Sequence, residues 1–139
     1  MRDSDLSTLT GTSDTAWFLA QLNTQPSLNL DYVLAEVGNP ANYDMGQLNF
    51  QTRQTPTFSF WRNAISGNDQ LRQRVAFALS QILVISHAEG SFLFEVPQMT
   101  AHYQDILVNN AFGNYRELLE QVTYSPAMGE YLTYLQNTK

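Results

Sequence analysis

His102, Asp105 and Arg72 are the side chains whose types and spacing best fit a catalytic site. His102 and Asp105 lie three residues apart, so on one helix they share a face and could form a hydrogen bond or half of a metal site. A metal would need further ligands, for example Glu89 or Glu95. Arg72 could bind an anionic group. We expect these three residues to contribute to catalysis only if the fold brings them to one cleft.

Arg72 and Arg74 also have a structural interpretation, which we favour. On a helix they lie about 200° apart, so a single pocket would not naturally use both. Both stand near the start of a predicted helix, where the helix dipole disfavours cations. We therefore expect carboxylate partners on neighbouring helices, with Asp105, Glu117 and Glu120 as the candidates.

Other patterns for catalysis or metal binding are missing from the sequence. There is no cysteine, and hence no disulfide, thiol nucleophile or thiolate metal site. His87 and His102 lack a metal-binding spacing such as HExxH, and there is no GxSxG turn or glycine-rich phosphate loop. The pair Glu117 and Glu120 fits a solvated helix face better than an acid–base couple. We predict no metal and no cofactor.

Charge limits the possible partners. The chain has 13 acidic and 7 basic residues, a net charge of −6, and a single lysine, Lys139. Nucleic acids and anionic membrane surfaces require clustered cations, so we predict binding to neither. No apolar run approaches the roughly 18 residues that a membrane span needs. The polar, acidic N-terminus is wrong for a signal peptide.

The elements that would position these side chains are helices. Hydrophobic residues make up 43% of the 139-residue chain, which is ample for the core of one domain. After a polar lead-in over residues 1–12, we expect one helical domain over residues 13–139, with no convincing strand pattern. Its helices should lie approximately over residues 13–23, 28–37 or 30–37 (capped by Ser27 or Asn29), 56–65, 68–86, 97–112, 114–124 and 125–137.

The helix predicted over Asn68–Ser86 carries polar groups in an apolar setting. Ser80 can bond to a carbonyl one turn earlier and Gln81 can link neighbouring helices, so we interpret both as structural. Two longer loops are expected, over about residues 41–55 and 87–96. Short connections elsewhere favour antiparallel neighbours. The predicted fold is therefore an all-α irregular bundle or array of about 6–7 helices.

The aromatic residues allow a third hypothesis, that the chain is a carbohydrate-binding module. Trp17, Trp61, Tyr124, Tyr131 and Tyr134 could form a sugar-stacking platform if exposed, although their helical setting favours packing in the core. This hypothesis requires Trp17 or Trp61 to be exposed beside a groove, and burial of both would exclude it.

Three blocks of the sequence resemble the bacterial "domain of unknown function 1800" family. They are FWRNAISGNDQLRQRVAFALSQILVIS, HYQDILVNNAFGNYRELLEQVTYSPAMGEYL and the ending NTK. The resemblance implies membership of a group whose proteins are usually much longer and generally exported. They are often encoded beside another exported family of sulfatase-like character. The family has no established catalytic residues to carry over.

The family's opening Phe-Gly-Pro segment and its later Glu-Asn-Ala-Arg-Glu-type segment are not found here. We therefore expect a fragment of the family's domain, whose partner is the missing downstream part or another exported protein. The prediction is a helical structural or interaction domain of an exported (periplasmic or extracellular) protein, with no catalysis in this piece. The alternative is part of a hydrolase acting on polysaccharide or envelope material, with its remaining catalytic groups downstream.

Overall fold

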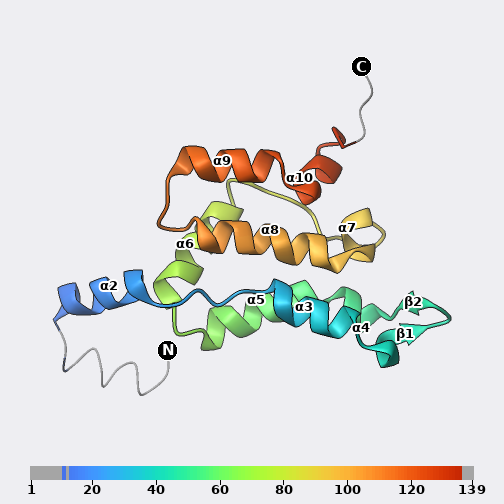
Figure 1. Ribbon diagram of the computed structural model, residues 1–139, viewed down its shortest axis with the longest axis horizontal. Helices are drawn as coiled ribbons and strands as arrows, with labels where there is room; N and C mark the ends of the chain where they lie inside the picture. Colours follow the sequence, from blue (N-terminus) through green and yellow to red (C-terminus); the bar gives the residue numbers. More distant parts are fainter. Residues whose placement is uncertain (1–10, 12, 136–139) are drawn as a thin grey trace.

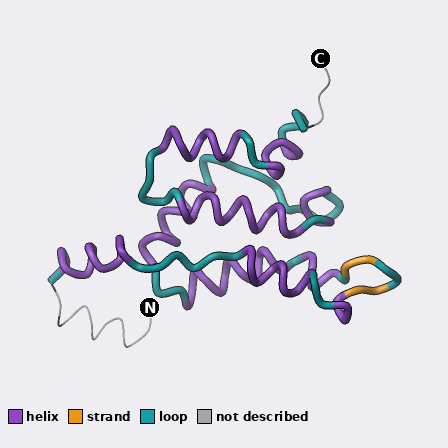
Figure 2. Tube along the Cα trace, in the orientation of Figure 1, coloured by secondary structure: helices purple, strands orange, loops and turns teal. Residues whose placement is uncertain are grey.

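The computed structural model describes residue 11 and residues 13–135, and these residues form a predominantly helical fold, as predicted (Figures 1 and 2). The polar lead-in expected over residues 1–12 therefore falls outside the described residues, apart from residue 11. The elements in chain order are α2 (Asp14–Asn23), α3 (Leu30–Val37), the 3-10 helix η1 (Pro40–Asn42), β1 (Tyr43–Asp44), β2 (Gln47–Leu48), α4 (Phe50–Arg53), α5 (Thr55–Ser66), α6 (Gln70–Ser80), α7 (Phe92–Glu95), α8 (Pro97–Asn109), α9 (Tyr115–Thr123) and α10 (Pro126–Tyr131).

Helix α8 lies at the centre of the described fold. It packs against α3 and α5 on one side and against α9 and α10 on the other, and it also contacts α6 and α7 (Figure 1). Eight of its thirteen residues are buried, which explains why its sequence shows no simple apolar stripe.

The two sides of α8 have different interiors. Toward α9 and α10 the core is apolar, and burial of each large apolar side chain there contributes about 1.5–3 kcal/mol. Toward α3 and α5 the buried groups are mainly polar. The buried apolar cluster comprises Ala76, Leu93, Tyr103, Ile106, Leu107, Val108, Leu118, Val122, Ala127 and Met128.

Helix starts follow the capping signals in the sequence. The Ser13 hydroxyl accepts a hydrogen bond from the Ala16 amide, and that of Ser125 accepts one from Met128. Asn114 caps α9 through the amide of Arg116 rather than that of Glu117. Seven described helices have six or more residues, in agreement with the predicted number.

Both predicted loops contain short elements that the sequence did not indicate. Residues 41–55 include a hairpin in which β1 pairs antiparallel with β2, followed by α4. Met45 and Gly46, at the tip of the hairpin, both have positive φ (49° and 82°), as a tight primed turn requires. Residues 87–96 include α7. Each addition is too short to give a periodic signal.

Helix α6 is shorter than predicted and ends at Ser80 rather than near Ser86. The Tyr103 hydroxyl donates to the Leu83 carbonyl at 2.6 Å, so this carbonyl is bound to another helix instead of to a later turn of its own. The β-branched residues Ile82, Val84 and Ile85 also favour extended backbone. The chain therefore leaves the helix and runs along the molecule to α7.

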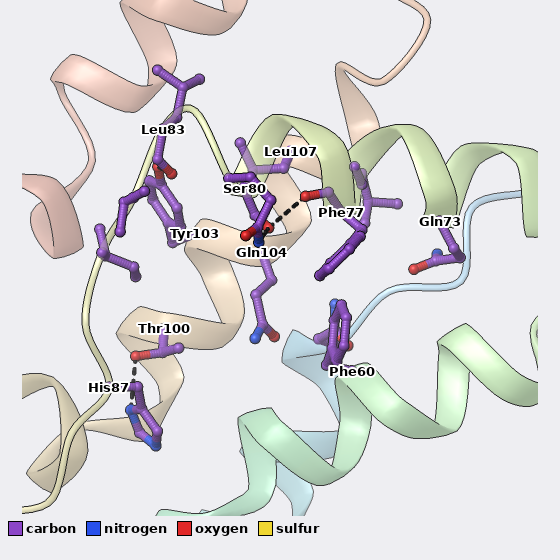
Figure 3. A pocket seen from close by; sticks show the side chains of 16 residues that line it. Phe60, Gln73, Phe77, Ser80, Leu83, His87, Thr100, Tyr103, Gln104 and Leu107 are labelled. Atoms are coloured by element: carbon purple, nitrogen blue, oxygen red, sulfur yellow. Dashed lines mark hydrogen bonds between the residues drawn. The ribbon is translucent and has the colours of Figure 1, made fainter.

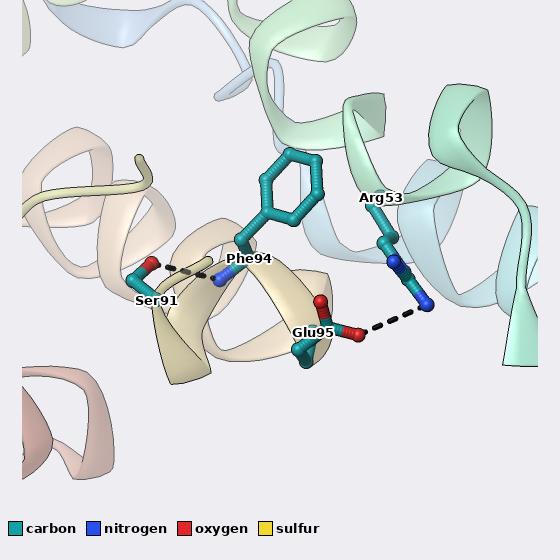
Figure 4. A network of polar contacts seen from close by, with 4 residues as sticks. All are labelled: Arg53, Ser91, Phe94 and Glu95. Atoms are coloured by element: carbon teal, nitrogen blue, oxygen red, sulfur yellow. Dashed lines mark hydrogen bonds and ion pairs between the residues drawn. The ribbon is translucent and has the colours of Figure 1, made fainter. Parts of the chain in front are cut away.

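A small cluster holds α7 against α4 (Figure 4). Arg53 forms an ion pair with Glu95 at 3.0 Å, and its guanidinium lies 6.0 Å from the centre of the Phe94 ring. The Ser91 hydroxyl accepts from the Phe94 amide and caps α7. This cluster holds the connection over residues 87–96 against the connection over residues 41–55.

None of the helices within residues 11 and 13–135 is both long and apolar enough to cross a membrane.

Candidate functional site

Asp105 is placed by α8 at the start of α3. One carboxylate oxygen accepts hydrogen bonds from the Asn29 amide (2.7 Å) and the Asn29 side chain (3.0 Å), and the other accepts from the Leu30 amide (3.0 Å). The first N–H groups of a helix have no partner within the helix. Asn29 makes no side-chain cap itself, so a residue 76 positions away supplies the cap.

Asn29 connects this cap to α5. Its side-chain oxygen accepts from the Ser59 hydroxyl (2.8 Å) and from the Asn63 side chain (3.1 Å). Asn63 also donates to the carbonyls of Ser27 and Leu28. All three polar side chains of this cluster are buried. The segment before α3 is thereby tied to both α5 and α8.

Asp69 and Gln73 bind the same segment from the start of α6. One oxygen of Asp69 accepts from the Ser27 amide (2.9 Å) and from the Gln73 side chain (3.0 Å), and Gln73 donates to the Ser27 carbonyl (3.0 Å). Asp69 is fully buried, and its other oxygen has no partner among the described residues.

The electrostatics of Asp105 reflect its burial. Desolvation raises the pKa of this carboxyl above its ordinary value, while the hydrogen bonds from Asn29 and Leu30 and the charge of His102 act in the opposite direction. Both carboxylate oxygens are already engaged as acceptors. The group therefore acts as a cap and has no free oxygen directed at a substrate.

Arg72 is buried, and it binds backbone groups rather than a carboxylate. Its guanidinium reaches the carbonyls of Leu22 (3.3 Å), Thr24 (3.5 Å) and Val108 (3.5 Å) and lies over the Phe112 ring, 4.6 Å from its centre. These contacts replace the ion pair that was expected for Arg72, because the carbonyls at the end of α2 face α6, the helix that carries Arg72.

Arg74 is exposed, and no ion pair of this residue occurs in the described part of the chain. The expected partners Glu117 and Glu120 are also exposed, on α9. Ser80 donates to the Phe77 carbonyl, as predicted, whereas Gln81 is exposed and reaches only Ser80 instead of a neighbouring helix.

The candidate catalytic residues do not share a cleft. His102 is exposed on α8, Asp105 is buried against α3, and Arg72 points to the end of α2. His102 and Asp105 are near enough to interact electrostatically. However, none of the three lines the cavity described next. Among residues 11 and 13–135, no group of three or more His, Asp or Glu side chains could hold a metal ion.

A cavity of about 300 Å³ lies between α5, α6, α8 and the segment after α6 (Figure 3). Phe60 and Phe77 lie close together at one end, with ring centres 5.9 Å apart. His87 and Thr100 lie at the other end and are hydrogen-bonded at 3.1 Å. The cavity thus combines aromatic rings with uncharged polar groups.

His87 is held by hydrogen bonds at both ring nitrogens. Nε2 lies 2.9 Å from the Arg53 carbonyl, which can only accept, so Nε2 carries the proton and Nδ1 accepts from the Thr100 hydroxyl. Burial lowers the pKa of His87. The uncharged ring is therefore favoured at neutral pH, and its contacts link the segment after α6 to α4 and α8.

The large aromatic side chains are more exposed than the sequence suggested. Trp61 is 57% exposed and Tyr124 is 81% exposed, while Trp17 is partly buried. Expected core packing of these rings is thus wrong for Trp61 and Tyr124. Trp61 packs edge-on against Phe60, so it stands beside the cavity, as the carbohydrate-binding hypothesis requires.

The buried polar cluster escaped prediction, although two signals were present. Ser59 and Asn63 are four residues apart, as are Asp69 and Gln73, so each pair lies on one helix face. The spacing places each pair on one face, but it does not distinguish a buried polar face from a solvated one. Their partner Asn29 could not be found this way, because its contacts are all distant in sequence.

Comparison with known proteins gives the family. A protein-family model described as "Protein of unknown function (DUF1800)" matches residues 1–139. A comparison with curated proteins and another with solved structures each found no match. The family match spans the blocks in which the sequence resembles that group. This chain belongs to the DUF1800 family of proteins of unknown function.

Proposed function

We propose that this chain is a helical structural and interaction domain of an exported bacterial protein, and that it performs no catalysis itself. The observation that carries the proposal is the orientation of α5. This helix turns polar side chains toward the interior and apolar side chains toward solvent.

The outward face of α5 is an apolar stripe formed by Phe58, Trp61 and Ile65. These residues follow a spacing of three and then four, so they lie on one side of the helix, and they are 51%, 57% and 69% exposed. The opposite side carries the buried Ser59 and Asn63. Contiguous apolar side chains that face water mark interaction sites.

The residues around the stripe are of the types that dominate protein interfaces. Arg62 lies on the same helix with its guanidinium 4.4 Å from the centre of the Tyr32 ring. Tryptophan, tyrosine and arginine supply much of the energy of protein binding, because they fill well-packed pockets from which water is excluded. The partner is therefore a protein surface with an apolar centre. The rest of a longer family domain and another exported protein are the two candidates.

The absence of catalysis is supported by the way in which the polar side chains are used. Asp105, Arg72 and His87 each direct their polar atoms at backbone groups or neighbouring side chains of the fold. A catalytic group needs a free lone pair or proton directed at substrate. Export is supported by the family resemblance alone.

Photo-crosslinking in cells tests the proposal. A photoreactive amino acid replaces Trp61 or Ile65 in the stripe, and Glu120 on the exposed face of α9 serves as the control position. We expect a discrete crosslinked protein from the stripe and none from Glu120. Equal labelling at the three positions, or no adduct from the stripe, would contradict the proposal. Recovery of the protein only from the cytoplasm would contradict its export.

A further inference from the structure

We propose that the cavity between α5, α6 and α8 binds a neutral polyhydroxylated ligand, namely a sugar ring that stacks on Phe60 and Phe77 and bonds to Gln104. This goes beyond the proposed function, because the stripe residues Phe58, Trp61 and Ile65 do not line the cavity. The two surfaces can therefore be tested separately.

The size of the cavity selects a small ligand. Its volume of about 300 Å³ is at the lower end of the range of roughly 300–1,000 Å³ found for ligand sites. This is suited to one sugar ring, and a longer chain of rings could continue past the exposed edge at Phe77.

The charge of the lining selects a neutral ligand. Among the residues that the structure describes, no Asp, Glu, Lys or Arg side chain lines the cavity. Burial lowers the pKa of His87 below its ordinary value of 6.5, although the Nε2–H bond to the Arg53 carbonyl acts in the opposite direction, so His87 adds no charge to the cavity at neutral pH. A phosphate, carboxylate or ammonium group entering here would lose its water without gaining an opposite charge, which is costly.

The aromatic pair provides a surface for the C–H face of a sugar. Phe60 and Phe77 are tilted by 41° to each other, and Trp61 supports Phe60 with ring centres 5.3 Å apart. Phe77 is about half exposed, so part of its ring is open to a ligand. The negative face of an aromatic ring attracts polarised C–H groups.

Gln104 favours a hydroxylated ligand over a purely apolar one. It lines the cavity, and its side-chain oxygen is buried without a partner among the described residues. A buried acceptor without a hydrogen bond destabilises the protein. This oxygen is fully covered, so the terminal amide must rotate to present it to the cavity. A sugar hydroxyl can then donate to the oxygen and accept from the nitrogen, whereas a hydrocarbon would leave both unpaired.

Titration of the chain followed by amide NMR tests this site. The probes are methyl β-glucopyranoside and cellobiose, with glucuronate and glucosamine as charged controls and toluene as an apolar control. We expect saturable shifts with the two neutral sugars, located around Phe60, Phe77 and Gln104. We expect no saturable shifts with the three controls.

Two variants and one control separate the site from the stripe. Phe77→Ala and Gln104→Met should each weaken sugar binding by about tenfold or more, because the first removes the ring on which the sugar stacks and the second removes the amide that bonds to it. Ile65→Ala, in the stripe, should leave the affinity unchanged. Cooperative melting of every variant confirms that the fold is kept, and Gln104→Met retains the shape of the side chain if Phe77→Ala does not fold.

The proposal is overturned if neither neutral sugar binds at millimolar concentration, or if glucuronate, glucosamine or toluene binds as well as they do. It is also overturned if the Gln104 variant binds as tightly as the original chain. None of these outcomes affects the crosslinking result expected for the stripe.

Discussion

Asp105 and Arg72 show how charged side chains serve this fold at single positions. Both side chains are buried, and both form hydrogen bonds with the backbone of another segment. Asp105 accepts from the start of α3, and Arg72 donates to the end of α2. Removal of either should be costly, because it leaves buried backbone groups without a hydrogen-bond partner, even though the Nε of Arg72 itself has none among the described residues.

The stability contributed by Asp105 should depend on pH. Burial raises its pKa in the folded chain above the ordinary value of 3.8. Between the unfolded pKa of 3.8 and the higher folded pKa, the folded chain binds more protons than the unfolded chain. The contribution of Asp105 to stability is therefore largest below pH 3.8 and is lost as pH rises through the folded pKa. Within that window the slope cannot be steeper than about −1.4 kcal/mol per pH unit, which corresponds to one whole proton.

Urea unfolding of the original chain and of Asp105→Asn across acidic to neutral pH measures this contribution. The difference in unfolding free energy between the two should decrease as pH rises, since the asparagine does not titrate. Asn109→Ala, at an exposed position on α8, replaces no titratable group and serves as the control. A profile unchanged by Asp105→Asn would show that its carboxyl is not desolvated.

Arg72 and Arg74 should differ sharply although they are two residues apart. Arg72→Ala removes a buried cation that binds three carbonyls and lies over Phe112, so we expect a loss of about 1.5–3 kcal/mol of unfolding free energy. Arg74→Ala removes an exposed charge and should cost less than about 0.5 kcal/mol. Equal losses in chemical denaturation would be inconsistent with this placement.

Sequence patterns identified these side chains but not their partners. The spacing of Arg72 and Arg74 correctly places them on different sides of α6. It could not show that carbonyls rather than carboxylates would meet Arg72, because those carbonyls are distant in sequence and become neighbours only when the helices pack.

Among the elements, α5 departs most from the usual arrangement. Its buried Asn63 donates to two backbone carbonyls and to Asn29, whereas Ile65, two residues later, is mostly exposed. The usual expectation for a helix is the reverse, with apolar residues inside. The buried polar side fixes the helix in place, and the apolar side remains for a partner.

The effect of this reversal can be measured by substitution on the two sides of α5. Asn63→Ala leaves several buried polar groups unpaired, so we expect a loss of about 2–3 kcal/mol. Ile65→Ser should cost less than about 0.5 kcal/mol, since the side chain has little contact to lose. Chemical denaturation that ranks the two in the opposite order would mean that α5 is turned the other way.

Helices with clear caps were predicted better than the connections between them. The starts at Ser13, Pro97 and Ser125 are confirmed because each depends on neighbouring residues. The end of α6 was wrong because Tyr103, on another helix, takes the Leu83 carbonyl. The hairpin, α4 and α7 were missed because two to four residues give no periodicity.

In the described molecule as a whole, α8 separates an apolar core on the side of α9 and α10 from the polar cluster on the side of α3 and α5. The polar cluster specifies geometry, because hydrogen bonds are directional, while the apolar core supplies most of the stabilisation. The exposed stripe of α5 lies on the polar half, where the fold itself gains least from apolar burial.

Hydroxyl-radical footprinting tests this account most directly, by comparing the purified chain with the same protein in cells. Oxidation of Phe58, Trp61 and Ile65 is measured by mass spectrometry, with exposed Tyr124 as the internal reference. We predict rapid oxidation of the three stripe residues in the purified chain and strong protection in cells, with Tyr124 oxidised in both. Equal oxidation of the stripe in both settings would mean that no partner covers it and would contradict the proposed interaction.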